Sequence, residues 1–537
     1  MDAKNDGSPY EHLNGEWKKT TRVLLGRELG ELKDYEKWLL ELKQPRLKCD
    51  SAVSGREVVF ASGDYATHAR SVGLDEVSEK FEPLGINQIK DVDSIIEALR
   101  ERMHYCGNIV LGNSKYVEKS SSVSNSFYVY ESARIYDSKN IACSTIAKTC
   151  QNLFGCNVGS FADYVIRCHQ YGKGSRNFES CLCWMSSDCH YTYNVVGCND
   201  CLFSFNLKAK RYAIGNLVLP REKYLAIKKN ILEELADILE EKKRAPMLVE
   251  IINNCGTPSS GQLASLSAFA MPSTEKGEMR QIEVAFAKTS KLVLGKELSG
   301  VDNYAPWLKR HIIDVDETES VLGSGKIPVP AYANFQALRK DRYVNIVEAD
   351  AISDRLKLAE EDAARIDFSN ASEILSRIAF LSSQFQTGEI ANVFKAPIII
   401  SSTNCYSILG CVNLKDSAFS TWPNGSDHVF GSAFVFNSAF CLNSYQSFNL
   451  NNCFEVDTSS NSARCYFSHN IENVHDSMFC FNAKNLSYAV GNTPLGRETY
   501  LKAKDMLQSW LLEKLEKKKD VGTDIFNLLG TDANYKP

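Results

Sequence analysis

The feature that most constrains this chain is an unbroken period of three residues between positions 399 and 489. Every third residue there is small or aliphatic, apart from Pro423, and no charged residue enters the series. Asn, Asp, Lys, His and aromatic residues take the two positions between. An α-helix repeats near 3.6 residues and a strand repeats at 2, so a period of three fits neither. It predicts a solenoid in which short strands and corners turn one side chain inward per triplet.

Two columns of residues spaced twelve apart predict the length of each coil. One column is asparagine with a single glycine, residue types that tolerate the left-handed backbone of a corner. Its members are Asn413, Gly425, Asn437, Asn449, Asn461, Asn473 and Asn485. The other column is apolar: Tyr406, Ala418, Phe430, Leu442, Phe454, Tyr466, Met478 and Val490. We therefore expect about twelve residues and four inward positions per coil, and rank a longer coil second because it would scramble both columns.

The chain is a tandem duplication. Six residues near the N-terminus recur after a constant offset of 269, and the triplet period also runs through residues 111 to 213. Both repeat stretches close on a Phe-Asn…Gly-Asn motif that precedes a helical pattern. The matched pairs are Gly26 and Gly295, Glu28 and Glu297, Leu29 and Leu298, Tyr35 and Tyr304, Trp38 and Trp307, and Leu39 and Leu308. Internal repeats of this kind predict two copies of one architecture.

These motifs support a resemblance to known repeat proteins. The triplets resemble short-coil β-solenoids such as the insect antifreeze proteins with twelve-residue coils. The closing motif and its helix look like those of uncharacterised prokaryotic Cys/Asn/Ser-rich triplet-repeat proteins. The resemblance covers roughly half of the chain and implies a fold, with no established activity. The flat Thr-x-Thr array of ice-binding proteins is absent from this sequence, which excludes an antifreeze role.

The predicted fold class is mainly β with α/β parts. We expect two parallel β-helix (β-solenoid) domains with about twelve residues per coil, each with an N-terminal α/β cap and a C-terminal helix, because open solenoid ends need covering. The predicted parts are a tail (1–18), a cap (19–107), a β-solenoid (108–216), a capping helix (217–245), a linker (246–285), a second cap (286–389), a second β-solenoid (390–492), a capping helix (493–519) and a tail (520–537).

Charge and hydropathy exclude several classes of partner. A net charge of −5 and a pI near 6.1 argue against a nucleic-acid partner, which normally requires a basic face. No apolar run reaches the roughly 18 residues of a membrane span. The first residues are polar and lack the apolar core of a signal peptide. We therefore expect a soluble, cytoplasmic protein with no membrane span.

The cysteines follow the same triplet period. Fifteen of the 18 lie in the two repeat stretches, and thirteen of those occupy inward positions. Because a free cysteine behaves as a small buried hydrophobe, we interpret most of them as packing residues. Cys198 and Cys201 have CxxC spacing but are consecutive inward positions. Disulfides between coils and a metal site remain alternatives, although typical zinc sites require two such pairs or added histidines.

The sequence contains no clear catalytic pattern. His190 falls in an apolar column and is interpreted as a packed residue. Gly323 to Lys326 reads Gly-Ser-Gly-Lys, which lacks the spacing of a phosphate-binding loop and predicts a turn, with an anion site as the alternative. No nucleophile–base pair and no paired carboxylates stand out. We therefore predict no catalytic residue, no cofactor and no metal site.

The predicted function is a structural or scaffolding protein that self-associates into an ordered assembly. A continuous outer apolar column is too large to leave in water and marks a contact surface. The predicted contact residues are Tyr406, Phe430, Leu442, Phe454, Tyr466 and Met478. The column could instead be covered within the chain by a cap, a terminal helix or the other copy's column. Two other functions stay open: a binding module for a protein or carbohydrate partner, and an enzyme similar to solenoid acyltransferases.

Overall fold

The computed structural model describes residues 9–66, 68–77, 84–270 and 277–530. The chain is mixed α/β, with 34% strand and 29% helix, and its large sheets are mostly parallel. It divides into two compact units, each assembled from three separate stretches of sequence, of which only the described residues are considered. Unit 1 comprises Met1–Gln44, Val110–Ser273 and Glu317–Phe385, and unit 2 comprises Pro45–Ile109, Thr274–Asp316 and Gln386–Pro537.

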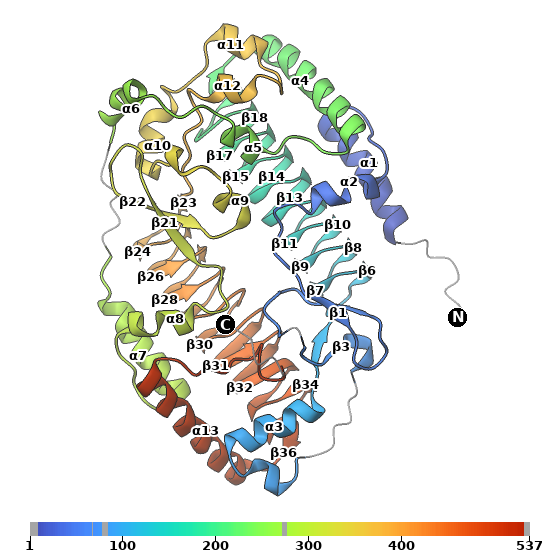
Figure 1. Ribbon diagram of the computed structural model, residues 1–537, viewed down its shortest axis with the longest axis vertical. Helices are drawn as coiled ribbons and strands as arrows, with labels where there is room; N and C mark the ends of the chain where they lie inside the picture. The colour runs from blue at the N-terminus through green and yellow to red at the C-terminus, as the bar shows by residue number, and fades with distance from the viewer. Residues whose placement is uncertain (1–8, 67, 78–83, 271–276, 531–537) are drawn as a thin grey trace. The chain divides into compact units, whose positions relative to one another are not determined.

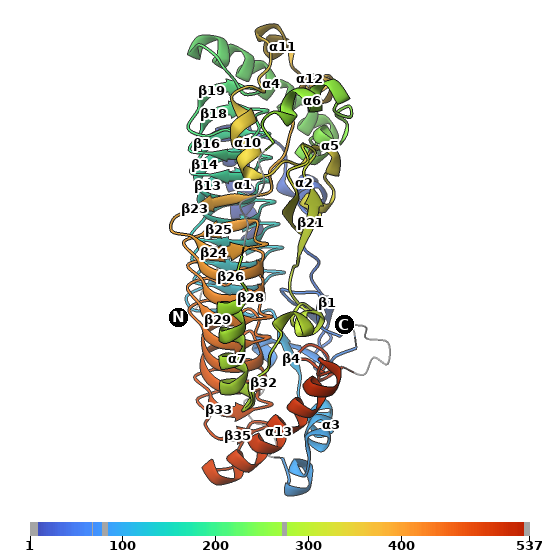
Figure 2. The same ribbon diagram turned by 90° about the vertical axis from the view of Figure 1, so that its left-hand side faces the viewer.

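Unit 1 is organised around a parallel stack of strands, named here ladder 1, whose strands lie one above the next in Figure 2. The parallel strands pair at a spacing of twelve residues, so that Ile141 lies between Val129 and Leu153, except at the start of the ladder, where Val110 pairs with Val123. The strands are β5 (Val110–Leu111), β6 (Lys115–Glu118), β7 (Ser121–Ser124), β8 (Phe127–Tyr130), β9 (Ala133–Tyr136), β10 (Lys139–Ala142), β11 (Thr145–Lys148), β12 (Gln151–Phe154), β13 (Asn157–Ile166), β14 (His169–Phe178), β15 (Cys181–Trp184), β16 (Ser187–His190), β17 (Tyr193–Val196), β18 (Asn199–Leu202), β19 (Arg211–Ile214) and β20 (Leu217–Val218). The last strand, β20, is antiparallel to β19 and ends the parallel register.

Unit 2 contains the matching stack, ladder 2, with the same register: Val429 lies opposite Cys441, and Cys441 opposite Cys453. Its strands are β23 (Phe385–Thr387), β24 (Ala391–Phe394), β25 (Ile398–Ile400), β26 (Thr403–Ile408), β27 (Cys411–Val412), β28 (Lys415–Ser420), β29 (Asp427–Phe430), β30 (Ala439–Leu442), β31 (Phe448–Asp457), β32 (Ser460–Glu472), β33 (His475–Met478), β34 (Phe481–Lys484), β35 (Ala489–Val490) and β36 (Thr493–Pro494). The twelve-residue spacing read from the sequence is thus the pairing register of both ladders.

The inward positions form a narrow core of aliphatic, cysteine and serine side chains. Its serine hydroxyls are satisfied by a repeating pattern. Ser126 Oγ donates to the carbonyl of Ser124 over 2.8 Å and accepts the N–H of Ser138, twelve residues on, over 3.0 Å. A buried hydroxyl without partners would cost about 1–3 kcal/mol. The pattern explains how serine can alternate with valine and isoleucine in a buried series.

A left-handed residue in every triplet turns the chain. The sequence assigns this conformation to one asparagine column, but the structure places it in all four columns of each ladder. The φ angle is positive even at β-branched Ile146 (59°) and Val158 (55°), where it is costly. Each such residue costs on the order of 1 kcal/mol, offset by the parallel hydrogen bonds that the turn makes possible. Asparagine therefore marks where the conformation is easiest, not every place where it occurs.

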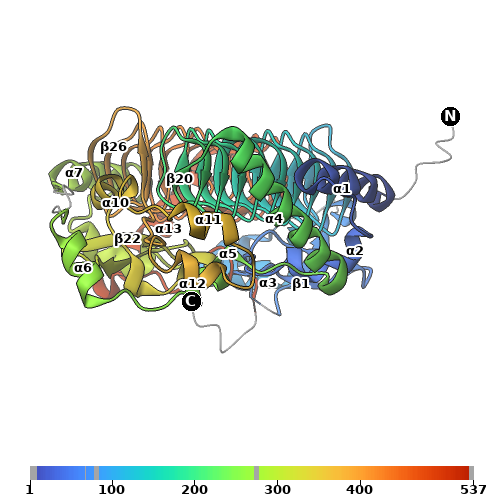
Figure 3. The ribbon, with the colours of Figure 1, turned by 90° about the horizontal axis from the view of Figure 1, so that it is seen from above.

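Helices cover ladder 1 along one side and across its end. Figure 3 shows α1 (Pro9–Leu25) alongside the ladder and α4 (Arg221–Lys242) crossing its end beside β20. The other helices of this unit are α2 (Leu32–Leu39), α5 (Leu248–Asn253), α6 (Ser260–Ser267), α9 (Ala333–Gln336), α10 (Ile346–Ser353), α11 (Glu360–Arg365) and α12 (Ala371–Leu375), with the 3-10 helix η4 (Lys340–Arg342) and the strand pair β21 (Val315–Glu319) and β22 (Lys326–Pro330). The expected tail over 1–18 therefore contains the start of α1, while its residues 1–8 lie outside the described residues.

Unit 2 repeats this arrangement, with α7 (Arg280–Leu294) and α13 (Arg497–Lys518) beside ladder 2 in Figure 1. Its other elements are α3 (Val92–Arg102), α8 (Ala305–Leu308), η1 (Leu74–Glu76), η2 (Ile86–Ile89), η3 (Val301–Tyr304), β1 (Lys48–Asp50), β2 (Glu57–Val59), β3 (Ser71–Gly73) and β4 (Tyr105–Gly107). The expected linker over 246–285 contains α5, α6 and the start of α7, and its residues 271–276 lie outside the described residues.

The caps do not cover the ladders that follow them in the sequence, which corrects the expected domain order. Residues 45–109, expected to cap ladder 1, belong to unit 2, and residues 317–385, expected to cap ladder 2, belong to unit 1. Each docks on the side of its ladder through an equivalent asparagine. Asn206 donates to the carbonyl of Phe380 over 2.8 Å in unit 1, and Asn482 donates to the carbonyl of His104 over 2.9 Å in unit 2. The two copies exchange their caps.

Candidate functional site

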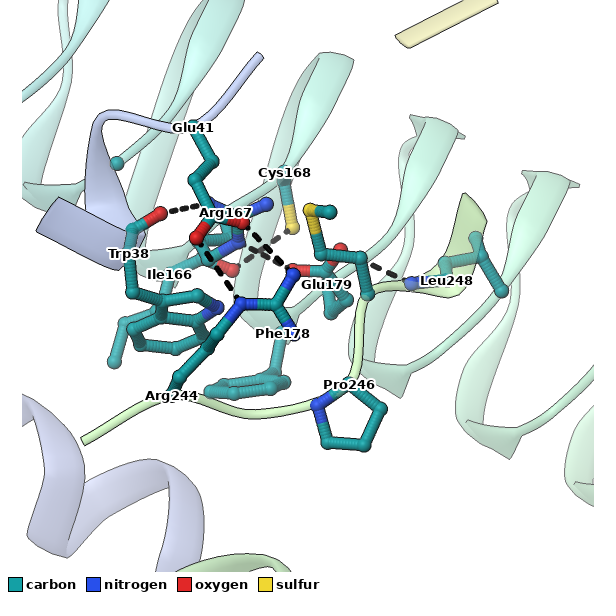
Figure 4. A network of polar contacts seen from close by, with 12 residues as sticks. Trp38, Glu41, Ile166, Arg167, Cys168, Phe178, Glu179, Arg244, Pro246 and Leu248 are labelled. Atoms are coloured by element: carbon teal, nitrogen blue, oxygen red, sulfur yellow. Dashed lines mark hydrogen bonds and ion pairs between the residues drawn. The ribbon is translucent and has the colours of Figure 1, made fainter. Parts of the chain in front are cut away.

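A cluster of buried charge in unit 1 lies where α2, ladder 1 and the residues after α4 meet (Figure 4). Arg167 and Glu179 occupy neighbouring positions of one column, and their side chains are 0% and 4% exposed. Arg167 Nε donates to Glu179 Oε2 over 2.8 Å, and its Nη1 donates to the carbonyl of Trp38. The guanidinium also lies 5.1 Å from the centre of the Trp38 ring, a cation–π distance. The ion pair thereby fastens the end of α2 to the ladder.

Glu179 has a second partner on the other side. Its Oε1 accepts the backbone N–H of Leu248, the first residue of α5, over 3.1 Å. One buried carboxylate thus holds both the arginine of the ladder and the segment that follows α4. A buried ion pair is weak support for stability by itself, but removing one partner leaves an uncompensated buried charge. The arrangement is suited to fixing segments in place.

A second ion-pair group lies at the edge of the same cluster. Arg244 donates to both carboxylate oxygens of Glu41, over 3.0 Å each, and to Glu250 over 2.6 Å. Nearby, the Lys43 ammonium donates to the carbonyl of Gly155, and burial lowers its pKa to about 7. A lysine with such a pKa could act as a base or nucleophile, but here its nitrogen is directed at a backbone carbonyl.

The corresponding place in unit 2 has different chemistry. An offset of 276 residues puts Asn443 where Arg167 stands and Glu455 where Glu179 stands. Asn443 Nδ2 donates to Glu455 Oε1 over 3.0 Å, and Glu455 Oε2 accepts the N–H of Ile525 over 3.0 Å. Burial, reinforced by the nearby carboxylate of Asp524, raises the pKa of Glu455 to about 8. At neutral pH this glutamate is therefore largely protonated, and the contact between Asn443 and Glu455 is not an ion pair.

Residues 520–530, expected to be part of a loose tail, are packed against this cluster. Asp524, Ile525, Phe526, Leu528 and Leu529 are all at most 1% exposed. His311 Nε2 lies 3.1 Å from Asp524 Oδ2, and its Nδ1 lies 3.4 Å from Asp64. Burial alone would lower the pKa of His311, but its hydrogen bonds to Asp524 and Asp64 prevail and raise it to about 9. The imidazolium bridges the cap and the C-terminal segment. Residues 531–537 of the expected tail lie outside the described residues.

A further polar cluster in unit 2 pairs a histidine with an aspartate, as a catalytic dyad does, but its contacts hold the cap against ladder 2. His469 Nδ1 lies 2.9 Å from Asp457 Oδ2, and both side chains are fully buried. His469 Nε2 accepts the backbone N–H of Cys106 over 2.9 Å, so the ring proton is on Nδ1 and points to Asp457. The Tyr65 hydroxyl donates to the same carboxylate. Both imidazole nitrogens are occupied in holding the cap, which leaves no lone pair free to accept a proton from a substrate.

The six residues expected to form an assembly surface are covered within unit 2, which corrects that expectation. Phe430, Leu442, Phe454 and Met478 are 0% exposed, Tyr466 is 1% and Tyr406 is 9% exposed. Phe430 meets Phe286 of α7 edge-on at 5.3 Å, and Phe454 stacks with Trp307 at 6.1 Å. The Tyr466 hydroxyl donates to the carbonyl of Val293 over 2.7 Å. Helix packing satisfies the column because an amphipathic helix supplies a complementary apolar stripe.

Sequence reasoning missed the residues that hold the segments together. The available signal was a pair of glutamates, Glu179 and Glu455, at matching positions of the two copies, in columns that both contain aromatic residues and glycine. Recognising their role required knowing which segment docks beside them. Cys198 and Cys201 lie in the ladder core at 0% exposure, where hydrogen bonding to a neighbouring thiol (Cys201 and Cys189, respectively) and then burial raise the pKa of both thiols. Within the described residues, no three His, Cys, Asp or Glu side chains are placed to hold a metal ion.

The His311 and Glu455 pKa values predict that unit 2 loses stability as pH rises. Both folded-state values, about 9 and about 8, lie above the ordinary values of 6.5 and 4.5. A raised folded-state pKa contributes stability below the unfolded value and loses it as pH rises through the folded one. We expect on the order of 3 kcal/mol from His311 to be lost between about pH 6.5 and 9.

Differential scanning calorimetry across this pH range would measure the effect. The transition of unit 1 serves as an internal reference, because Leu42 stands where unit 2 has His311. His311→Gln should flatten the dependence of the unit 2 transition. An unchanged pH profile in that variant would contradict the assignment.

Comparisons with known proteins assign no relative to this chain: no family model, no curated protein and no solved structure matches it. The structure adds one exclusion. No helix among the described residues combines the length and apolar character needed to cross a membrane.

Proposed function

We propose that this protein is a structural scaffold, built from two β-solenoids of about twelve residues per coil, that self-associates into an ordered assembly. The observation that carries the scaffold proposal is the use made of buried charge. Arg167, Glu179, Glu455, Asp457 and His469 all bind segments of their own unit. Groups that could carry chemistry are thus engaged in holding caps and helices against the ladders, an arrangement suited to a rigid building unit.

Self-association is proposed through the strands near the start of each ladder. Among the described residues, β6 pairs only with β8 and β24 only with β26, so each is an edge strand. Edge strands present unpaired backbone groups that can template a further strand. Exposed apolar side chains lie beside both edges: Leu111 is 40% exposed and Ile390 is 37% exposed. The opposite ends are closed by the antiparallel strands β20 and β36.

Light scattering over a micromolar concentration series, with negative-stain microscopy, tests this proposal. The variant Leu111→Lys/Ile390→Lys should remain folded by circular dichroism and lose the assembly, because two charges then flank the edges. Val284→Lys, at a 59% exposed residue on α7, is the matched control and should leave the assembly intact. A parent protein that stays monomeric throughout the series would end the self-association proposal. Lysine at Phe430 or Phe454 would test folding instead, because both side chains are buried.

The proposal includes a reducing compartment such as the cytoplasm. All 18 cysteines are free thiols, and 17 of them are buried. Thiols persist in reducing surroundings, whereas secreted proteins of comparable cysteine content usually pair them.

A binding module is the second candidate function, favoured by a hollow of about 570 Å³ on the outer surface of ladder 1. Its lining combines an aromatic side chain, Phe161 at 54% exposure, with acidic, basic and amide groups suited to carbohydrate hydroxyls. The polar members include Asn125, Asp137, Lys139, Gln151 and Asp163. A glycan array probed with the parent chain and Phe161→Ser tests this candidate; equal signals from both would remove it.

A further inference from the structure

The exchange of caps raises a question of specificity. In each copy a pair of helices precedes the cap: α1 and α2 in the first, α7 and α8 in the second. Each pair packs on its own copy's ladder, although the cap that follows it in the chain belongs to the other unit. The sequence similarity of the copies makes the crossed alternative plausible, with α1 and α2 on ladder 2 and α7 and α8 on ladder 1. Some contact must favour the observed choice.

Several contacts of the helix pairs are the same in both units and cannot discriminate. Lys243 lies over the ring of Tyr35 at 5.4 Å, and Lys519 lies over Tyr304 at 5.0 Å. Two ladder glycines, Gly155 and Gly431, admit the leucine at the end of the helix pair. A Cβ on Gly155 would lie 2.8 Å from Leu39, and one on Gly431 would lie 2.9 Å from the carbonyl of Leu308. Because these partners are identical in type, either helix pair would satisfy either ladder.

One contact differs in the sign of its charges. In unit 1 the helix pair supplies an acid and the segment after α4 a base: Glu41 with Arg244. In unit 2 the helix pair supplies the base and the segment after α13 the acid: Arg310 with Asp520. The positions are equivalent, because 310 is 41 plus 269 and 520 is 244 plus 276, the offsets of the two surrounding regions. Both copies have an ion pair at this position, but the acidic and basic residues have exchanged places between the helix pair and the C-terminal segment.

We propose that this reversed ion pair specifies which helix pair docks in which unit. In the crossed arrangement Glu41 would face Asp520 and Arg310 would face Arg244, so both junctions would join like charges. The repulsion would be strongest in unit 2, where Glu41 would take the place of Arg310. The Arg310 side chain is only 6% exposed, and Asp524, 1% exposed, is its second acidic neighbour at 3.5 Å. Repulsion of like charges in a partly desolvated contact is an established source of specificity.

Cross-linking of engineered cysteines reports which arrangement forms. Arg27 on the helix pair lies beside Glu240 of α4, with Arg27 Nε 3.5 Å from Glu240 Oε1. Glu516 of α13 occupies the position equivalent to Glu240. In the background Arg27→Cys/Glu240→Cys/Glu516→Cys, a short bismaleimide and peptide mass spectrometry distinguish a 27–240 link from a 27–516 link. Cys49→Ser removes the native cysteine that is not fully buried.

The charge-swapped variant Glu41→Arg/Arg310→Glu makes the crossed arrangement the matched one. We expect the ratio of 27–240 to 27–516 links to fall by at least about tenfold relative to the parent charges. The neutral control Glu41→Gln/Arg310→Gln removes both the attraction in the observed arrangement and the repulsion in the crossed one, so its link ratio should lie between those of the parent and the charge-swapped protein. Unchanged link ratios in the charge-swapped protein would overturn the proposal.

A second variant keeps the test decisive if the charge-swapped protein does not fold. In an Asp524→Asn background, which removes the second acidic neighbour of this side chain, Arg310→Glu repels Asp520 in unit 2, and adding Asp520→Arg restores an opposite pair with reversed polarity. We expect Arg310→Glu alone to lose the unit 2 transition in calorimetry and the double variant to regain it. Failure of the double variant to recover would show that the identity of these side chains matters more than their charge, and would overturn the proposal.

Discussion

Val435→Asp is expected to unfold unit 2, with a loss of at least about 4 kcal/mol in the free energy of unfolding. Val435 is an inward residue of ladder 2 at 0% exposure, packed in the aliphatic and cysteine core. The carboxyl group would replace buried apolar surface and would have no arginine or lysine within the core to pair with. It would stay protonated in the folded state, so the loss should grow as pH rises.

Asn437→Asp, two residues further on, is the matched control. Asn437 faces outward with a positive φ of 51°, a conformation that aspartate tolerates nearly as well as asparagine. Its substitution should change the free energy of unfolding by about 0.5 kcal/mol or less. Calorimetry should show the unit 2 transition lost in the first variant and retained in the second. Equal stability of the two proteins would contradict the inward assignment of every third residue.

Replacing the same glutamate in each copy should have very different effects. Glu179→Gln leaves Arg167 fully buried without a counter-charge and places an amide donor against its Nε–H. We expect a cost of about 3–5 kcal/mol, the usual result of breaking a buried ion pair by removing one partner. The docking of Leu248 should weaken at the same time, because Glu179 holds its N–H.

Glu455→Gln should cost less than about 1 kcal/mol at neutral pH. A glutamine can still accept the N–H of Ile525, and its amide nitrogen can donate to Asn443 once that side chain turns its oxygen inward. The Asn443 Oδ1 atom has no hydrogen-bond partner within its unit in the present orientation, so rotating the side-chain amide would give this oxygen a donor. No buried charge is left behind, because Glu455 is already largely protonated near pH 7.

Denaturant titration of the two single variants measures this contrast. The double variant Arg167→Asn/Glu179→Gln, which gives unit 1 the neutral pairing of unit 2, should be more stable than Glu179→Gln alone, because the unpaired guanidinium is gone. Equal losses from Glu179→Gln and Glu455→Gln would show that the two clusters owe their stability to shape and not to charge.

The corrected assembly surface illustrates how far sequence periodicity can be taken. The sequence predicts that the column from Tyr406 to Met478 is apolar and outward from its ladder, and its size predicts a contact surface. Its contacts are made by α7 and α13. The apolar faces of these helices can also be read from the sequence, but the sequence does not show which surface they pack against. A helix of suitable pattern within the same chain has a far higher effective concentration than a second molecule. An apolar column is therefore covered by a helix of the same chain, in preference to a second molecule, wherever such a helix can reach it.

The sequence by itself determined the features that depend on local repetition. The triplet period determined which residues face inward, the columns at twelve-residue spacing determined the pairing register, and the offset of 269 with the shared closing motif determined the duplication. These features depend only on the backbone of each repeat and on its nearest neighbours in the stack, so the same sequence signal recurs in every repeat.

Only the tertiary structure decided which segment covers which ladder. The caps exchange, the residues after each terminal helix dock onto buried glutamates, and His469 holds a cap instead of a substrate. Two similar copies offer two similar docking faces, so local pattern cannot choose between them. The choice depends on a few long-range pairs, Glu41 with Arg244 and Arg310 with Asp520 among them, whose energies exist only once the segments meet.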